Sequence, residues 1–143
     1  MTPEHMTPEH IDEVADLFYA TFTAAGEKWT RERAKKHIIE SYFGECHYVV
    51  KKGTAIVGVL LAFPLTKVAG TELYIDTIAV HPQFQKNGIG TMLITAALEY
   101  AKKNDLVAVS LSAHAKLKSF TWYQSLGFVP TGWVELIKME KNR

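Results

Sequence analysis

Residues 80–91 read VHPQFQKNGIGT and join two apolar patterns of different period. Before this segment, Leu73–Val80 is rich in β-branched and aromatic residues, which predicts a strand. After it, apolar residues recur at helical spacing over Gly88–Lys103. Two glycines let the backbone approach an anion, and the first N–H groups of a helix carry partial positive charge. The segment therefore predicts a phosphate-binding turn between a buried strand and a helix.

The patterns on either side extend this unit to the rest of the chain. Thr7 caps a first predicted helix that Gly26 closes, and Thr30 caps a second. The other predicted elements are strands at 47–51, 55–63, 106–111 and 128–139, a loop at 64–70 and a helix at 116–125. This order predicts a mixed α/β (α+β) domain with at least one right-handed strand–helix–strand unit.

The N-terminus repeats the pentapeptide MTPEH at residues 1–5 and 6–10. Five residues are too few for a structural repeat. The duplication has three open explanations: a local duplication, a second start codon or a cloning artefact. We expect residues 1–6 to be disordered or foreign to the natural chain, and residues 1–143 to form a single domain.

Composition limits the classes of partner. The 143 residues carry 16 Lys+Arg and 15 Asp+Glu, so 16 − 15 gives a net charge of +1, which argues against a general nucleic-acid binder. No apolar run reaches the ~20 residues of a membrane helix, and the first residues lack a signal-peptide pattern. A single cysteine, Cys46, favours a reducing compartment. We therefore expect a soluble, cytoplasmic protein with no nucleic-acid or membrane partner.

Among phosphate-binding motifs, residues 85–90 fit one pattern. A Walker loop needs Gly-Lys-Ser/Thr, and a dinucleotide fingerprint needs glycine where Leu93 stands. The remaining Gln-x-x-Gly-x-Gly resembles the pyrophosphate loop of the GNAT superfamily of N-acetyltransferases. The preceding residues 78–82 (IAVHP) and the later residues 122–128 (WYQSLGF) also resemble that family, in the same order. The resemblance extends over residues 7–139.

The resemblance implies a GNAT-like acyl-CoA N-acyltransferase fold, in which about four helices flank a mixed antiparallel and parallel sheet. The family's first strand is expected to be short or missing, because only Met1–Met6, with Pro3, stands before the first helix. An exposed sheet edge there favours a homodimer or a covering segment. The strand ending at Val80 is expected to splay from the strand at 106–111, and the pantetheine arm of acetyl-CoA to enter the gap.

The resemblance also assigns site residues. Main-chain groups of the strand and loop, with Lys116 and Tyr123, are expected to bind acetyl-CoA; the strand and loop positions are Ile78, Ala79, Val80, Gln85, Lys86, Asn87, Gly88, Ile89, Gly90 and Thr91. Tyr123 occupies the position of the family's general acid; the alternative is a core aromatic residue. Asp76 is a candidate general base; the alternative is a hydrogen-bonded structural carboxylate.

Other chemically capable side chains have simpler interpretations. Glu72 lies near the start of the strand and is the weaker candidate for the base. We expect surface or hydrogen-bonding roles for His81 and His114, and a packing role for Cys46. Nothing has the spacing of a metal site. The aromatic residues of the first two helices, Tyr19, Phe22 and Trp29, are expected in the core, with a wall of the acceptor pocket as the alternative.

Lys116 and Ser119 depart from the family pattern, which places asparagine and a small residue there. Lys116 can still contact phosphates as a point charge, and Lys86 and Lys118 are further candidates. The function that the resemblance implies is acetyl transfer from acetyl-CoA to a primary amine of a small molecule or peptide, by direct attack in a ternary complex. The alternatives are a non-catalytic acyl-CoA-binding sensor module and a structural domain that merely uses the glycine turn.

Overall fold

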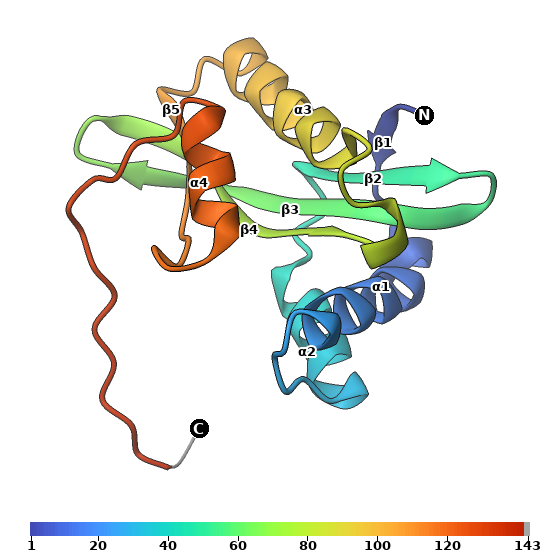
Figure 1. Cartoon of the computed structure of the whole chain (residues 1–143). Helices are drawn as coiled ribbons and strands as arrows, with labels where there is room; N and C mark the ends of the chain where they lie inside the picture. Colours follow the sequence, from blue (N-terminus) through green and yellow to red (C-terminus); the bar gives the residue numbers. More distant parts are fainter. Residues whose placement is uncertain (142–143) are drawn as a thin grey trace. The chain divides into compact units, whose positions relative to one another are not determined.

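The computed structural model describes residues 1–141, and Figure 1 shows its elements. In chain order these are β1 (Pro3–His5), η1 (Pro8–His10), α1 (Ile11–Ala24), α2 (Arg31–Ser41), β2 (His47–Lys52), β3 (Ala55–Lys67), β4 (Gly70–Val80), η2 (Pro82–Phe84), α3 (Ile89–Lys103), β5 (Ala108–Leu111) and α4 (Lys118–Ser125). The chain divides into two compact units between Ser112 and Ala113, and each unit is described by itself.

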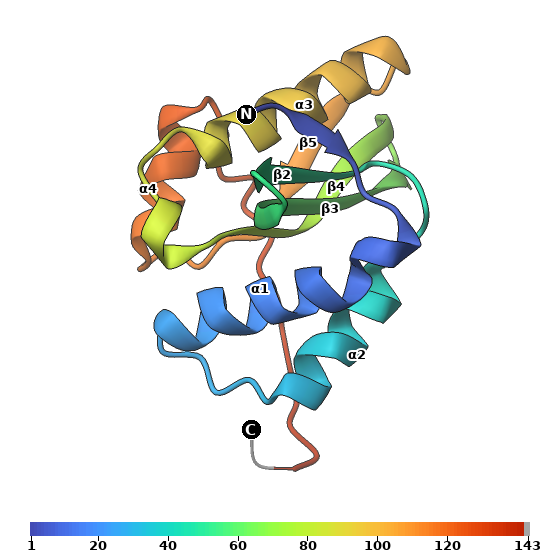
Figure 2. The same ribbon diagram turned by 90° about the vertical axis from the view of Figure 1, so that its right-hand side faces the viewer.

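The first unit contains a five-stranded sheet in the order β1-β2-β3-β4-β5. The pairs from β1 to β4 are antiparallel, whereas β4 and β5 are parallel and are joined through α3. α1 and α2 cover one face of the sheet, and α3 covers the other (Figures 1 and 2). The predicted mixed sheet and its strand–helix–strand unit are confirmed.

The face under α1 and α2 holds a large apolar core. α1 turns its apolar stripe toward the sheet, where it meets Val59, Leu61 and Ala79. The buried residues of the two helices in this core are Val14, Ala15, Leu17, Phe18, Ala34 and Ile38. Thr30 caps α2 as predicted, because its side chain accepts a hydrogen bond from the Arg33 N–H at 3.1 Å.

On the opposite face, Gly58 of β3 lets α3 pack closely against the sheet. A Cβ at this position would lie 2.7 Å from Ile89 Cγ2 and 3.3 Å from Leu93 Cδ1. Ile89 and Leu93 are fully buried in the first and second turns of α3. The start of α3 is therefore fixed on β3, and the turn at 80–91 is fixed with it.

The loop predicted at 64–70 is wrong, because β3 and β4 continue through most of it as a long hairpin. Pro64 is paired with Leu73 within the ladder. Proline lacks an N–H and is confined to strand edges. β2 pairs with β3 only as far as Leu61, so Pro64 stands where β3 has no β2 neighbour and a missing donor is tolerated.

At the N-terminus, Pro3–His5 forms the strand β1 on β2, which confirms the short first strand expected before the first helix. Met6 is buried, whereas disorder or a foreign origin was expected for residues 1–6. In the second unit, the strand predicted over 128–139 is wrong: no strand is present between Leu126 and Lys141. The apolar alternation is typical of a strand, but a strand also needs a hydrogen-bonded neighbour, and Trp133 and Leu136 are almost fully exposed.

Candidate active site

β5 ends midway along β4. Their parallel pairing runs from Glu72 with Ala108 to Ile75 with Leu111 and stops there. β4 continues to Val80, so five of its residues have no β5 partner within the described part of the chain. Ile78, Ala79 and Val80 belong to this open edge. The splay expected between the two strands stays a prediction. Because β5 ends at Leu111, the last residues of β4 have main-chain groups without a β5 partner.

The turn after β4 leads directly into α3. The Gln85 side chain donates from Nε2 to the Val80 carbonyl at 3.0 Å, which ties the turn to the end of β4. Lys86 has a left-handed backbone with φ of 68°, which is uncommon for a non-glycine residue. Gly88, with φ of 81°, is the N-cap of α3. The first N–H groups of α3, at Ile89, Gly90 and Thr91, have no acceptor within their own helix.

Two lysines lie in or beside this turn. Lys86 is exposed within it, next to the exposed Asn87. Lys52, at the end of β2, places its Nζ 4.9 Å from the centre of the Phe84 ring in η2. Lys52 was missed from the sequence, because only the folding of the β2–β3 hairpin brings it to the turn. Helix N–H groups and point charges together make this turn a suitable site for a phosphate.

A β-bulge on β4 presents Asp76. Leu61 of β3 pairs with Thr77 and the next residue, Ala62, pairs with Ile75, so Asp76 is the extra residue. A bulge leaves one residue unpaired and re-aims its side chain. Asp76 Oδ2 accepts hydrogen bonds from Ser41 Oγ of α2 at 2.8 Å and from Thr77 Oγ1 at 3.0 Å. The carboxylate is thus held on the face of the sheet that carries α2.

His37 of α2 completes this polar cluster. Its Nε2 lies 3.0 Å from Thr77 Oγ1 and 3.5 Å from Asp76 Oδ2. Its ring packs against Phe18 at 4.9 Å and Trp29 at 5.5 Å between ring centres. Sequence reasoning missed His37, Ser41 and Thr77. The adjacent polar pair Asp76-Thr77 interrupts an apolar strand, and this was the available signal for a bulge.

The remaining first-unit candidates have structural partners. Phe22, Tyr19 and Trp29 pack against the α1–α2 core as expected. Glu72 forms an ion pair with Lys67 at 3.0 Å. His81 caps η2 by accepting from the Gln83 N–H at 3.1 Å. Cys46 is buried, and burial raises the pKa of its thiol.

Lys116 and Tyr123 belong to the second unit. Tyr123 lies on α4, where its ring contacts Trp122 and Phe128 at 4.9 and 5.9 Å between centres. Burial raises the pKa of the Tyr123 phenol to about 12, so the hydroxyl keeps its proton at neutral pH. Lys116 donates its backbone N–H to His114 Nδ1 at 3.1 Å. α4 begins at Lys118, two residues later than predicted.

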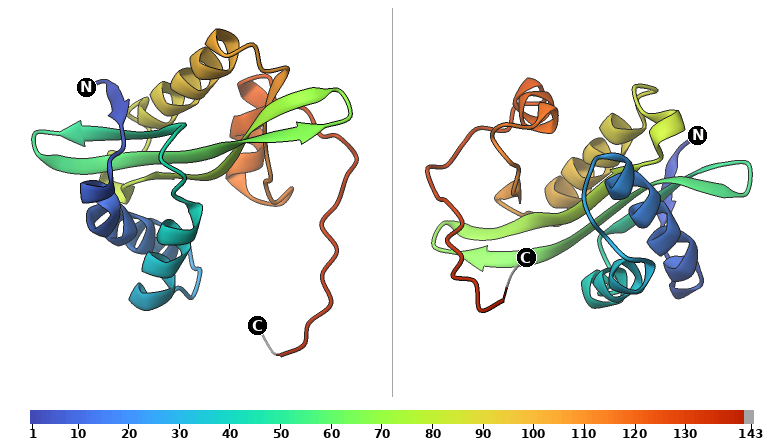
Figure 3. Two further views of the ribbon diagram at one scale, coloured as in Figure 1. Left: turned by 180° about the vertical axis from the view of Figure 1, so that it is seen from behind. Right: turned by 60° about the horizontal axis from the view of Figure 1, so that its bottom comes forward.

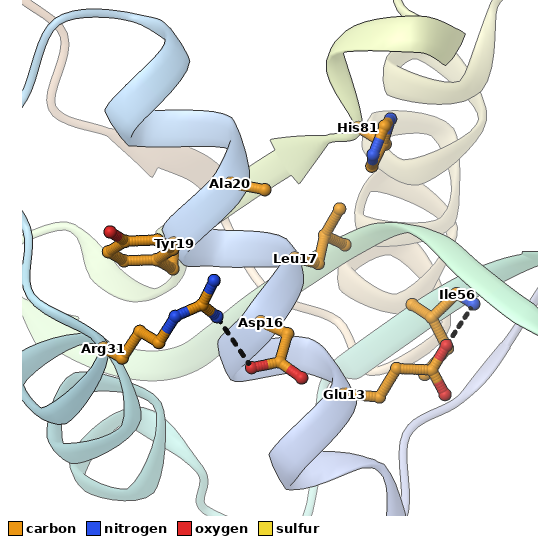
Figure 4. Close-up of a pocket in the computed structure, with 8 residues that line it drawn as sticks. All are labelled: Glu13, Asp16, Leu17, Tyr19, Ala20, Arg31, Ile56 and His81. Carbon is orange, nitrogen blue, oxygen red and sulfur yellow. Dashed lines mark hydrogen bonds and ion pairs between the residues drawn. The ribbon is translucent and has the colours of Figure 1, made fainter.

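A cavity of about 390 Å³ lies between α1, the start of α2, the start of β3 and His81 after β4 (Figure 4). Its charged side chains are already paired. Glu13 accepts from the Ile56 N–H at 2.8 Å, and Asp16 lies 3.7 Å from Arg31. It contains none of the predicted cofactor or catalytic residues. The open β4 edge and the turn at 85–91 remain the better candidate site.

His47 at the start of β2 is 2% exposed and supports the chain after α2 by accepting the Phe43 N–H on Nε2 at 2.8 Å. Burial lowers the pKa of His47 to about 4, whereas an unfolded histidine titrates near 6.5. Between these values the unfolded chain binds a proton that the folded chain does not. The contribution of neutral His47 to the free energy of unfolding is therefore complete above about pH 6.5 and is lost as pH falls toward 4.

We expect the free energy of unfolding to fall by about 2 kcal/mol more in the native protein than in His47→Gln between pH 7 and pH 5. Urea unfolding of both proteins at the two pH values measures the difference. Carboxylates that titrate in this range contribute equally to both proteins and cancel. Equal pH dependence in the two proteins would show that His47 does not carry this effect.

The acetyltransferase (GNAT) family model matches residues 11–128. The match includes strands β2 to β5, the turn at 85–91 and α4. The chain belongs to the GNAT family. The GNAT assignment made from three short motifs is confirmed.

Two curated relatives support the family over shorter stretches. This GNAT chain is 41% identical over 69 residues to an uncharacterized N-acetyltransferase of Methanocaldococcus jannaschii, an alignment that covers 45% of this chain and 30% of the relative. It is 33% identical over 70 residues to the [ribosomal protein bS18]-alanine N-acetyltransferase of Salmonella typhimurium, covering 48% and 47%. The matches therefore span less than half the length of either relative.

Solved structures support the GNAT fold over the whole chain. One is an aminoglycoside N-acetyltransferase in complex with CoA, with a TM-score of 0.75 at 14% identity, covering 97% of this chain and 94% of that one. At this identity the similarity shows the fold alone. Within residues 1–141, no helix of this GNAT chain is both long enough and apolar enough to span a membrane.

Proposed function

We propose that the protein binds acetyl-CoA along the open edge of β4 and transfers the acetyl group to a primary amine by direct attack in a ternary complex. The observation that carries this proposal is the N–H-rich turn at 85–91 beside the unpaired end of β4, in a chain of the GNAT family. Bound acetyl-CoA would supply the thioester that the amine attacks.

The residues present fit such a ligand. The left-handed Gly88 has nothing within 4 Å of the place a Cβ would take, so the N-terminus of α3 is open to an anion. Lys86 and Lys52 add positive charge beside it. Those main-chain groups of Ile78, Ala79 and Val80 that are not bonded to β3 or to Gln85 can pair with an amide-containing arm as a neighbouring strand would. Lys116 and Lys118 are further candidates for phosphate contacts.

Each proton in the reaction has a proposed partner. Asp76, directly or through water, takes the proton that the ammonium group loses before or during attack. A main-chain N–H near Ile78 donates to the carbonyl oxygen as it gains negative charge. Tyr123 keeps its phenolic proton at neutral pH because burial raises its pKa to about 12, so it can donate a hydrogen bond to the departing thiolate as charge develops on sulfur. It can pass this proton to the sulfur, and a proton from water then restores the phenol.

His37 and Ser41 act as positioning residues in this proposal. Ser41 and Thr77 bond the same carboxylate oxygen, which holds Asp76 in one orientation. His37 lies next to that oxygen and is fixed by its packing against Phe18 and Trp29. A held carboxylate loses less entropy when an ammonium group approaches. The cytoplasmic location and a homodimer remain predictions.

The test is a thiol-release assay with acetyl-CoA and a panel of primary amines, with mass spectrometry of the amine product. Stoichiometric free thiol and an amine product heavier by one acetyl group are expected for at least one amine. Binding of CoA without amine-dependent thiol release would favour the non-catalytic sensor module. The departures from the family pattern at Lys116 and Ser119 point to that alternative. Absence of both CoA binding and thiol release would contradict the proposal.

A further inference from the structure

Three aromatic rings form a continuous row on the sheet face that carries α1 and α2. Phe43 follows α2, Phe63 lies on β3 and Tyr74 lies on β4. The ring centres of Phe43 and Phe63 are 5.4 Å apart, and those of Phe63 and Tyr74 are also 5.4 Å apart. Phe63 and Tyr74 are direct cross-strand partners. Phe63 lies two residues from the core residue Leu61 and therefore shares its face. We call these three residues the aromatic row.

The aromatic row is accessible, unlike the core beside it. Phe43 is 61% exposed, and Phe63 and Tyr74 are half-buried. The β3–β4 hairpin extends past α2, so α1 and α2 do not cover this part of the sheet (Figures 1 and 3). Three adjacent accessible rings form an apolar surface of a kind that marks binding sites.

Two polar contacts hold the aromatic row in place. The Phe43 N–H donates to His47 Nε2 at 2.8 Å, which fixes the backbone of Phe43 on β2. The Tyr74 hydroxyl lies 3.0 Å from Ser112 Oγ, which fixes the ring of Tyr74 toward the end of β5. A preorganised aromatic surface costs little entropy when a ligand packs on it.

Asp76 lies at one end of the aromatic row. On β4, Tyr74 is two residues before Asp76 and shares its face. On the other side, Ser41 bonds Asp76 at 2.8 Å, and Phe43 is two residues after Ser41. Tyr74 is therefore two residues from Asp76, and Phe43 is two residues from Ser41, which bonds the Asp76 carboxylate. The site combines one oriented carboxylate with an aromatic surface.

This combination has a definite chemical complement. A carboxylate attracts an ammonium group, and aromatic rings favour offset or edge-to-face contact with another ring. We infer that the acceptor is a primary amine joined by a short chain to an aromatic ring, with the ring packed on Phe43, Phe63 and Tyr74 and the amine directed to Asp76. Polyamines and aminoglycosides lack an aromatic ring and leave the row without a partner. This inference rests on the proposed function, in which a primary amine accepts the acetyl group.

The experiment compares kcat/KM in the thiol-release assay for phenethylamine, a peptide with N-terminal phenylalanine, glycinamide, putrescine and kanamycin. We expect the aromatic amines to exceed the other three by about tenfold or more. The free amine and the peptide distinguish two sources of the same chemistry. Equal or higher kcat/KM for putrescine, kanamycin or glycinamide would overturn the inference.

Variants of the row separate binding from folding. Phe43→Ser removes an exposed ring and should raise KM for phenethylamine by about tenfold, with little change in kcat or in the rates with glycinamide. Phe63→Leu keeps apolar volume and should act in the same direction. Val68→Ser at the fully exposed hairpin tip is the control and should change nothing. Equal losses for all amines would indicate a structural effect and contradict the inference.

A second measurement does not depend on acetyl transfer. Saturation-transfer NMR of the full chain with phenethylamine should show saturation of the ligand's ring protons, reduced at least about threefold by Phe43→Ser and unchanged by Val68→Ser. Putrescine should show no comparable signal. Ring contact without thiol release from any amine would contradict the proposed function and leave the aromatic site supported. Thiol release without ring contact would support the proposed function and contradict the aromatic site.

Discussion

Replacing Tyr123 by phenylalanine should lower kcat by at least about tenfold and leave the dissociation constant of CoA nearly unchanged. A positioned proton donor contributes roughly 10²–10⁴ in rate, and a thiolate is a good leaving group, which places the effect toward the lower end. Phenylalanine keeps the ring that packs against Trp122 and Phe128 and removes only the hydroxyl. Single-turnover measurements with saturating acetyl-CoA and amine measure the chemical step.

Tyr100→Phe is the matched control. It also removes a phenol whose pKa is raised to about 12, but Tyr100 lies on α3 and its pKa is raised chiefly by hydrogen bonding with the Cys46 side chain. The kcat of Tyr100→Phe should stay within about twofold of the native value, because loss of this hydroxyl should change only stability, and by a small amount. Unchanged turnover in Tyr123→Phe would remove Tyr123 from the mechanism and support the alternative of a core aromatic residue.

Replacing Asp76 by asparagine should lower kcat/KM for the amine by about a hundredfold at pH 7. Asparagine can still accept from Ser41 and Thr77, so the bulge is retained while the base is lost. The defect should shrink as pH rises. Below its pKa near 10, an alkylamine gains about tenfold in free base per pH unit and depends less on the enzyme's base.

Glu72→Gln on the same strand tests whether any lost carboxylate has this effect. Glu72 pairs with Lys67, and the variant should keep kcat/KM within about twofold. An Asp76→Asn enzyme with native kcat/KM at pH 7, or a defect that stays constant from pH 7 to 9, would assign Asp76 a structural role instead.

The turn at 80–91 could be predicted from the sequence because its determinants are local. A strand pattern, two glycines and a helix pattern adjoin in twelve residues. The Thr30 cap is local for the same reason, and it also was predicted correctly. The longer hairpin was not, since Pro64 is acceptable in β3 only because β2 ends opposite Leu61. This property depends on how the strands pair in the folded sheet and is not encoded in the local sequence around Pro64.

The surroundings of Asp76 depend on distant parts of the chain. The bulge arises from the register between β3 and β4, and Ser41 and His37 come from a helix 35 or more residues earlier. Asp76 itself was a candidate from its place as the single carboxylate inside an apolar strand, together with the family resemblance, and its role as the base stays a prediction. The aromatic row was missed because Phe43, Phe63 and Tyr74 come from three elements and meet only in the folded sheet.

The turn's role as the cofactor site can be measured by isothermal titration of CoA into the full chain. We expect one CoA per chain with a Kd on the order of 10 μM, within the roughly 1 μM–1 mM span usual for substrates. Gly88→Val should weaken binding at least about tenfold, because valine disfavours the left-handed backbone that opens α3. Gly44→Val, at a similar φ of 84° with equally open surroundings, should bind CoA normally. Absence of heat at millimolar CoA, or equal binding by Gly88→Val and the native protein, would contradict the account.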